Sequence, residues 1–221
     1  MSIAENIKKF HELIPPGVEI VAVSKFHPSS LIMEAYEAGQ RCFGESRVQE
    51  FVEKVESLPK DIKWHFIGHL QTNKVKQIIG KTSLIESVDS DRLLRLINSE
   101  SEKRGVVTDV LLQVHVAQEE TKFGFSPEEL IAYLDSDEYK ELKAVRICGI
   151  MGMASNTDDE ERVKSDFHNL NEIYKTIKSN STYSLQDFKY LSMGMSGDWE
   201  IALEEGSNIV RIGSSIFGNR Y

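Results

Sequence analysis

Residues 42–69 read CFGESRVQEFVEKVESLPKDIKWHFIGH, and this stretch contains one complete strand–helix–strand unit. Cys42–Glu45 and Trp64–His69 are short apolar runs, which predict two strands. Arg47–Ser57, between them, repeats apolar residues at helical spacing and stops before Pro59, which predicts an amphipathic helix. Because strands joined through a helix run in the same direction, the unit predicts a parallel sheet.

The same unit recurs along the whole chain. Most of its apolar runs are continuous rather than alternating, as expected for strands covered on both faces. The predicted strands are Ile20–Lys25, Cys42–Glu45, Trp64–His69, Leu84–Val88, Val110–Val116, Val145–Met151, Tyr190–Met195 and Ile209–Gly213. Their alternation with helices predicts an α/β fold, a (β/α)8 TIM-type barrel, as a single domain over residues 1–221.

Helical patterns separate these strands. The further predicted helices are Ser29–Gly39, Asp91–Arg104, one that starts at Ser126-Pro127, Asp158–Lys178 and Ser196–Gly206. The chain stops soon after the eighth strand, so we expect the amphipathic segment Ile3–Leu13 to cover the place of an eighth helix. The alternative is an open doubly wound sheet, but the turn at Val23–Pro28 lacks the glycines of its nucleotide-binding version.

The net charge, the N-terminal sequence and the cysteines indicate which partners and which cellular compartment to expect. The net charge of −9 disfavours binding to nucleic acid or to an anionic membrane. The N-terminus lacks the apolar centre of a signal peptide, and no apolar run approaches the roughly 20 residues of a membrane span. Cys42 and Cys148 are interpreted as buried thiols of a reducing compartment, so we expect a cytoplasmic protein.

A lysine follows the first strand. Strand C-termini face the active rim of such a barrel, which places Lys25 there, although a surface lysine next to a strand is the alternative. At the other end of the chain, residues 191–197 and 211–218 are rich in glycine and serine and follow strands seven and eight, the usual phosphate position. Ser196 is expected to begin a short helix there and to face an anion, whereas two ordinary tight loops are the alternative.

An amine and a phosphate cup on one rim are the layout that holds a phosphorylated aldehyde. This combination predicts pyridoxal 5′-phosphate (PLP), bound as an imine to Lys25. Arg211 lies inside strand eight and needs a partner. It is expected either to face the pyridine nitrogen of PLP or to form a salt bridge with a barrel carboxylate such as Glu45 or Glu86.

The loop at residues 64–74 adds polar groups to the rim. His69 is a candidate site residue, whereas His65 is expected on a strand face. Four residues apart on a strand, these two histidines cannot ligate one metal together, so no metal site is predicted. No Gly-x-Ser-x-Gly elbow or P-loop occurs in the sequence.

At this point the motifs resemble those of the pyridoxal phosphate homeostasis proteins of the YggS/PROSC type, which share the barrel of the alanine racemase N-terminal domain. The matching segments are AVSK at 22–25, FGESRVQE at 43–50, HFIGHLQTNK at 65–74, SVD at 87–89, LSMGMS at 191–196 and RIG at 211–213. They occur in order over nearly the whole chain, and the longer ones are highly specific.

The resemblance implies roles for individual residues. Lys25 carries PLP as an imine, Arg211 faces the pyridine nitrogen, and three residues hold the phosphate: Ser196, Gly213 and Ser214. Ser46, His69 and Met193 are further candidates at the cofactor site. The sequence departs from the family pattern at Ser46, where asparagine is common, and at Glu86, where histidine is expected and to which we assign no role.

Two functional classes follow from the resemblance. The first is a PLP-dependent racemase-like enzyme, and the second is a PLP carrier and regulator without significant catalytic activity. A racemase needs a base on each face of the substrate carbon. The racemase's second base comes from a C-terminal domain, whereas this chain ends at Tyr221. We therefore expect a monomeric carrier that acts in vitamin B6 homeostasis, with PLP-dependent apoenzymes as candidate partners and secondary effects on amino-acid metabolism.

Overall fold

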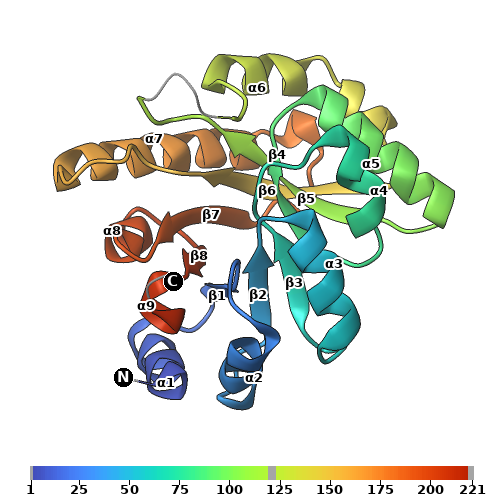
Figure 1. The fold of residues 1–221 in the computed structure, drawn as a ribbon. Helices are drawn as coiled ribbons and strands as arrows, with labels where there is room; N and C mark the ends of the chain where they lie inside the picture. The colour runs from blue at the N-terminus through green and yellow to red at the C-terminus, as the bar shows by residue number, and fades with distance from the viewer. Residues whose placement is uncertain (1, 119–122, 219–221) are drawn as a thin grey trace.

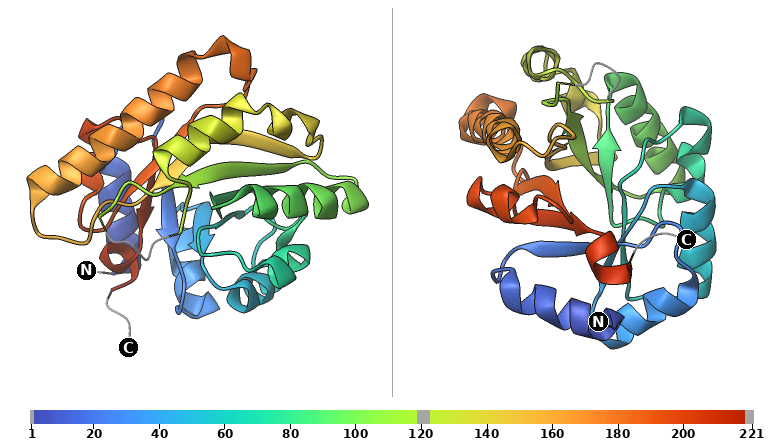
Figure 2. Two further views of the ribbon diagram at one scale, coloured as in Figure 1. Left: turned by 90° about the horizontal axis from the view of Figure 1, so that it is seen from above. Right: turned by 60° about the vertical axis from the view of Figure 1, so that its left-hand side comes forward.

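Eight parallel strands form a closed barrel. The computed structural model describes residues 2–118 and 123–218, and its strands follow chain order around the barrel until β8 pairs with β1 (Figures 1 and 2). The strands are β1 (Glu19–Val23), β2 (Cys42–Glu45), β3 (Lys63–Phe66), β4 (Leu84–Val88), β5 (Thr108–Val114), β6 (Val145–Gly152), β7 (Tyr190–Met195) and β8 (Ile209–Ile212). This arrangement confirms the predicted barrel and excludes the open sheet.

Helices cover the outside of the barrel (Figure 2). The α-helices are α1 (Ile3–Leu13), α2 (Ser29–Glu37), α3 (Val48–Ser57), α4 (Val75–Ile78), α5 (Asp91–Arg104), α6 (Pro127–Asp135), α7 (Glu160–Ser179), α8 (Trp199–Glu204) and α9 (Ser214–Phe217), with 3₁₀ turns η1 (Thr72–Lys74), η2 (Glu138–Glu141) and η3 (Ser181–Tyr183). Across the residues that the structure describes, no helix is both long and apolar enough to cross a bilayer.

The N-terminal helix completes the helical layer. The chain follows β8 with the four-residue helix α9, and α1 packs against both α9 and α2. The side-chain amide of Asn6 in α1 donates a hydrogen bond to the carbonyl of Ile216 at 2.9 Å, and the ring of Phe10 meets Trp199 of α8 edge-on. The expected role of Ile3–Leu13 is therefore confirmed.

Strands β1 and β3 end before their apolar runs do. β1 ends at Val23 and β3 at Phe66, although ladder hydrogen bonds reach one residue further, from Ser24 N to Gly44 O and from Ile67 N to Glu45 O. The prediction that these strands extend to Lys25 and His69 was wrong. Both residues lie in the rim loops that follow these strands.

The start of α8 also differs from the prediction. The helix begins at Trp199 rather than Ser196, with Asp198 at its N-cap position. The carboxylate of Asp198 accepts a hydrogen bond from the backbone N–H of Met195 at 2.5 Å. A carboxylate of the protein thus lies at this helix start, and Ser196 lies in the preceding turn instead of heading the helix.

The hydrophobic core has two parts. The larger cluster combines strand residues with residues of the surrounding helices and therefore lies between the barrel and its helical layer. The smaller cluster contains strand residues alone, which places it inside the barrel; its members are Val21, Cys42, Leu84, Leu111, Cys148, Met151 and Ile209. Both cysteines are buried and free, as expected. The inner cluster leaves the rest of the barrel interior to polar residues.

Candidate functional site

Lys25 lies in a tight turn at the mouth of the barrel. The side chain is half-buried, and the turn is closed by a hydrogen bond from His27 N to Ser24 O at 3.1 Å. Phe26 has a φ of 67°, a left-handed conformation that is uncommon for a bulky residue. The carboxylate of Glu50 holds Phe26 in this conformation by accepting its backbone N–H at 2.7 Å.

A buried ion pair supports the turn from below. The ammonium of Lys54 donates to the carbonyl of Ser24 at 2.9 Å and to Glu45 Oε1 at 2.7 Å. The hydroxyl of Ser24 donates to the same carboxylate oxygen at 2.6 Å. Burial raises the pKa of Glu45, and Lys54 offsets only part of this effect. The residue immediately before Lys25 is therefore fixed through its main chain and its side chain.

The loops after β7 and β8 are joined to each other. The backbone N–H of Gly213 donates to the hydroxyl of Ser196 at 3.1 Å. Directly after Gly213, α9 begins with Ser214 and Ser215, whose N–H groups, as the first of a helix, have no carbonyl partner within it. The hydroxyls and the N–H groups of Ser214 and Ser215 are a donor set that fits a phosphate, whereas the N–H of Met195 is taken by the carboxylate of Asp198. We refer to residues 195–197 and 213–215 as the anion cup.

The Lys25 turn lies next to this cup. The rings of His27 and Phe217 are stacked, with 4.9 Å between their centroids, so the turn after β1 packs on α9. A Cβ atom placed on Gly213 would lie 3.4 Å from Cβ of Val23, the last residue of β1. The two segments lie near opposite ends of the sequence, and the pairing of β1 with β8 brings them together. The turn that contains Lys25 and the loop after β8 are therefore neighbours at the mouth of the barrel.

Arg211 is buried in β8 below the mouth. Its guanidinium donates to the hydroxyl of Ser192 at 2.5 Å and to the carbonyl of Gly152 at 3.0 Å, and it lies 3.8 Å from Glu86 Oε2. The salt-bridge alternative names the right partner, Glu86, whereas Glu45 pairs with Lys54. Because a guanidinium carries five N–H donors, these contacts leave capacity for one more acceptor.

Glu86 links three strands inside the barrel, and sequence reasoning named it only as an alternative salt-bridge partner of Arg211. Its Oε1 lies 2.6 Å from His65 Nδ1, and its Oε2 accepts from the Ser192 hydroxyl at 2.5 Å. Burial disfavours the charged carboxylate, but the hydrogen bond and charge of His65, together with Arg211 and Ser192, hold the pKa of Glu86 below its usual value. An acid within the apolar run Leu84–Val88 was the available signal that a buried partner exists.

The remaining candidates lie at different depths. Ser46 follows β2 and presses against Gly68, where an added Cβ would come within 2.3 Å of the Ser46 carbonyl oxygen. The ring of His69 is partly exposed at the rim, hydrogen-bonded to Asp89 at 3.0 Å. Met193 is wholly buried in the larger core cluster, so its side chain packs among helix residues rather than at the mouth.

Comparisons with known proteins agree with this geometry. Residues 1–220 match the model of the family described as "Alanine racemase, N-terminal domain". A protein of Schizosaccharomyces pombe named "Pyridoxal phosphate homeostasis protein" is 42% identical over 92% of this chain and 85% of its own length. One of the same name from Aquifex aeolicus is 41% identical over 99% of this chain and 95% of its own length.

The solved structures include a similar protein in two states. PipY of Synechococcus elongatus without PLP superposes with a TM-score of 0.92 at 34% identity, covering 98% of this chain and all of that chain. The same protein with PLP bound superposes with a TM-score of 0.88 at 33% identity. The barrel described above therefore has the fold of a protein that binds PLP.

Proposed function

Because the chain belongs to the alanine racemase N-terminal domain family and, within it, to the pyridoxal phosphate homeostasis proteins, we propose that it binds PLP. In this proposal the protein is a carrier that keeps the aldehyde of the cofactor masked. One observation carries the proposal: the Lys25 turn packs, through the stack of His27 on Phe217, on α9, the helix whose first residues belong to the anion cup. An amine and a phosphate-binding loop on neighbouring segments suit a ligand that has an aldehyde at one end and a phosphate at the other.

Each part of the site has a role in this proposal. The amine of Lys25 condenses with the aldehyde, with loss of water, to form an imine. Three residues of the cup hold the phosphate: Ser196, Gly213 and Ser214. The guanidinium of Arg211 donates to the pyridine nitrogen, and Ser46 and His69 line the rim beside the ring. The fixed backbone at Ser24 and the joined loops of the cup keep these groups in position without the ligand.

The proposed contact of Arg211 with the pyridine nitrogen favours a carrier over a racemase-like enzyme, the second candidate. A guanidinium stays protonated, so a pyridine nitrogen that faces it stays unprotonated and the ring is a weaker electron sink. Glu86, Ser192 and the carbonyl of Gly152 hold Arg211 in place. The site therefore supports imine formation with Lys25 more strongly than chemistry at the α-carbon of an amino acid.

The cup predicts selectivity between vitamers. PLP should bind far more tightly than pyridoxal, because pyridoxal lacks the phosphate that the cup receives. Ser196→Ala should weaken PLP binding by about 1.5–3 kcal/mol, the contribution of one hydrogen bond to a charged group. Fluorescence titration of the protein freed of cofactor measures both effects. Ser179→Ala, at the C-terminal end of α7, serves as the control. Equal affinities for the two vitamers would show that the cup does not recognise phosphate.

The carrier proposal predicts very low turnover. The protein loaded with PLP, incubated with single L-amino acids, should yield no meaningful racemase, transaminase or decarboxylase activity. Chiral chromatography and keto-acid assays follow the products. A kcat/KM of about 10⁴ M⁻¹s⁻¹, at the lower end for ordinary enzymes, would replace the carrier with the enzyme.

Transfer to apoenzymes and the monomeric state are further parts of the proposal. Mixing the PLP-loaded protein with an apo-aminotransferase should restore that enzyme's activity, and light scattering should report the mass of one chain. Free PLP should change when the gene is deleted, with secondary changes in amino-acid pools. Unchanged PLP and amino-acid pools in the deletion strain would contradict a role in homeostasis.

A further inference from the structure

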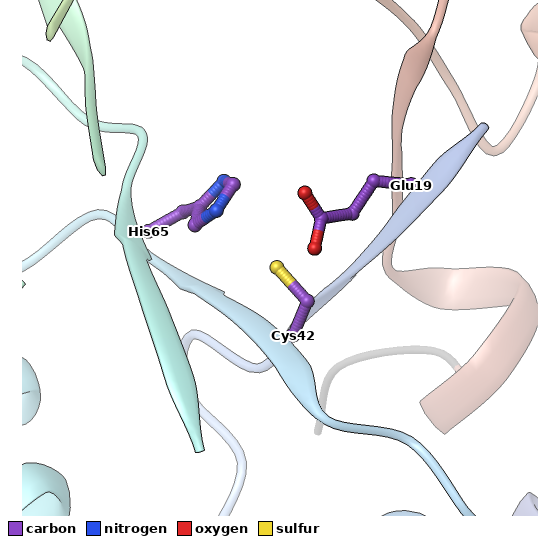
Figure 3. A group of neighbouring side chains, drawn as sticks. All are labelled: Glu19, Cys42 and His65. Carbon is purple, nitrogen blue, oxygen red and sulfur yellow. The ribbon is translucent and has the colours of Figure 1, made fainter. Parts of the chain in front are cut away.

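Three potential metal ligands converge at the end of the barrel opposite the mouth. Glu19 and Cys42 are the first residues of β1 and β2, and His65 lies in the neighbouring strand β3. Their ligand atoms all lie within 4.8 Å of one another. Figure 3 shows the three side chains pointing toward a common centre from three adjacent strands. Carboxylate, thiolate and imidazole are the ligand types that Zn²⁺ binds in proteins.

The imidazole of His65 is already oriented for ligation. Its Nδ1 lies 2.6 Å from Glu86 Oε1, so the Nδ1 proton is donated to the carboxylate, and release of the Nε2 proton leaves that lone pair for a metal ion. Metal-bound histidines usually have this second contact to a carboxylate, which fixes the ring and raises the basicity of the ligating nitrogen. Glu86 is fully buried, and its other oxygen is held by Ser192, so the ring cannot turn freely.

The spacing of the three groups is close to that of a zinc site. Bonds of about 2.0–2.3 Å at tetrahedral angles separate ligand atoms by roughly 3.3–3.8 Å. A separation of up to 4.8 Å therefore has to close by roughly 1.5 Å at most on binding. Glu19 can make this movement, because its side chain is 28% exposed, whereas Cys42 and His65 are buried. Lys63 lies 3.7 Å from Glu19 and is 64% exposed, so it can move away toward solvent.

A cavity gives access to the cluster. Glu19 and Cys42 line a cavity of about 490 Å³ at this end of the barrel, together with His11, Gln40 and Arg41. Three protein ligands leave the fourth zinc position open toward this space, as in zinc sites that retain a water molecule or an external ligand. Arg41 is the positive group on the cavity wall, and its guanidinium is paired with Asp61 at 3.3 Å.

We propose that Glu19, Cys42 and His65 bind one divalent transition-metal ion of the zinc class at the N-terminal end of the barrel, with Glu86 as the residue that orients His65. Binding releases the thiol proton of Cys42 and the Nε2 proton of His65 to solvent and leaves two anionic ligands around the ion. The proposal does not depend on the cofactor site, which lies at the other end of the strands.

Co²⁺ is the probe for this site, because a thiolate bound to Co²⁺ gives a charge-transfer absorption band. The full-length protein, reduced and treated with a chelator, should develop this band on titration with Co²⁺ at one ion per chain. Adding Zn²⁺ should abolish the band by displacement, and Zn²⁺ alone should raise the melting temperature. No band, or a band without saturation at one equivalent, would overturn the proposal.

Matched variants locate the site. Cys42→Ser should lose the band, whereas Cys148→Ser, the other buried thiol of the inner cluster, should keep it. Glu19→Gln tests the partly exposed ligand and keeps the buried pair intact, so it decides the outcome even if Cys42→Ser does not fold. It should weaken Co²⁺ binding severalfold while leaving PLP binding unchanged. Wild-type Co²⁺ affinity in Glu19→Gln, or the band in folded Cys42→Ser, would contradict the assignment.

Discussion

Replacement of Lys25 with alanine is expected to abolish covalent PLP binding. The purified wild-type protein should be yellow, and borohydride should fix a phosphopyridoxyl group on Lys25, because this residue lies in the turn that packs on α9 beside the anion cup. The Lys25→Ala protein should lose the imine absorption completely and show no mass increase after borohydride. It should still bind PLP weakly through phosphate, since the cup is formed by other residues.

A lysine elsewhere on the rim provides the control. Lys74 is half-buried in η1, after β3. Lys74→Ala should retain the colour and the borohydride label. Peptide mapping that finds the label mainly on a residue other than Lys25 would refute the assignment of the amine. Weak PLP binding by Lys25→Ala that still prefers PLP over pyridoxal would support the separation of amine and cup.

The second large effect is expected at Glu86. Glu86→Ala leaves both Arg211 and His65 without their carboxylate in the barrel interior, and breaking a buried pair in this way costs about 3–5 kcal/mol of unfolding free energy. Glu86→Gln should cost less, because the amide oxygen still accepts one hydrogen bond. The remaining cost arises because the N–H₂ group then faces either His65 or Ser192, both of which donate to the carboxylate. Urea unfolding at neutral pH measures both. Glu56→Gln, in an exposed pair with Lys81, should change stability little.

The lowered pKa of Glu86 also gives this residue a pH signature. A carboxylate with a lower pKa in the folded than in the unfolded protein contributes stability that is present above its ordinary value of 4.5 and is lost as the pH falls through the folded pKa. Wild-type stability should therefore decline more steeply below pH 4.5 than that of Glu86→Gln. Parallel stability curves for the two proteins on acidification would show that Glu86 is not held in its charged form.

Much of the barrel could be predicted because its signals are local. β2, β4, β7, α1 and α5 have the predicted bounds, since each is a complete apolar run or an amphipathic stretch between clear stop signals. Gly105, for example, ends α5 with a φ of 65°, a conformation that glycine adopts without strain. The ends of β1 and β3 were harder, because Ser24 and Ile67 still make ladder hydrogen bonds although the strands stop.

The site was predictable only where it follows strand ends. Lys25 and the glycine–serine loops could be placed at the rim from topology. The contacts of Glu86 could not, because His65, Ser192 and Arg211 come from three other strands and meet it only through closure of the barrel. The same holds for Glu19, Cys42 and His65, which are close in the structure but far apart in the sequence, so that no short motif reveals them. The position of Asp198 at the N-cap depends on where α8 begins, a boundary that composition does not set.

The pairing of β1 with β8 ties the cofactor site to the completion of folding. Ile20 lies opposite Val210, so the contacts between the Lys25 turn and the cup have nearly the largest sequence separation that this chain allows. Such contacts form late, because a long loop must close first, and during synthesis the cup emerges last. Under the proposed function, a nascent chain exposes Lys25 before the residues of the cup have been made. Ligand that binds only the closed barrel would add its binding free energy to the final step, which predicts that the supply of the vitamin raises the yield of mature protein.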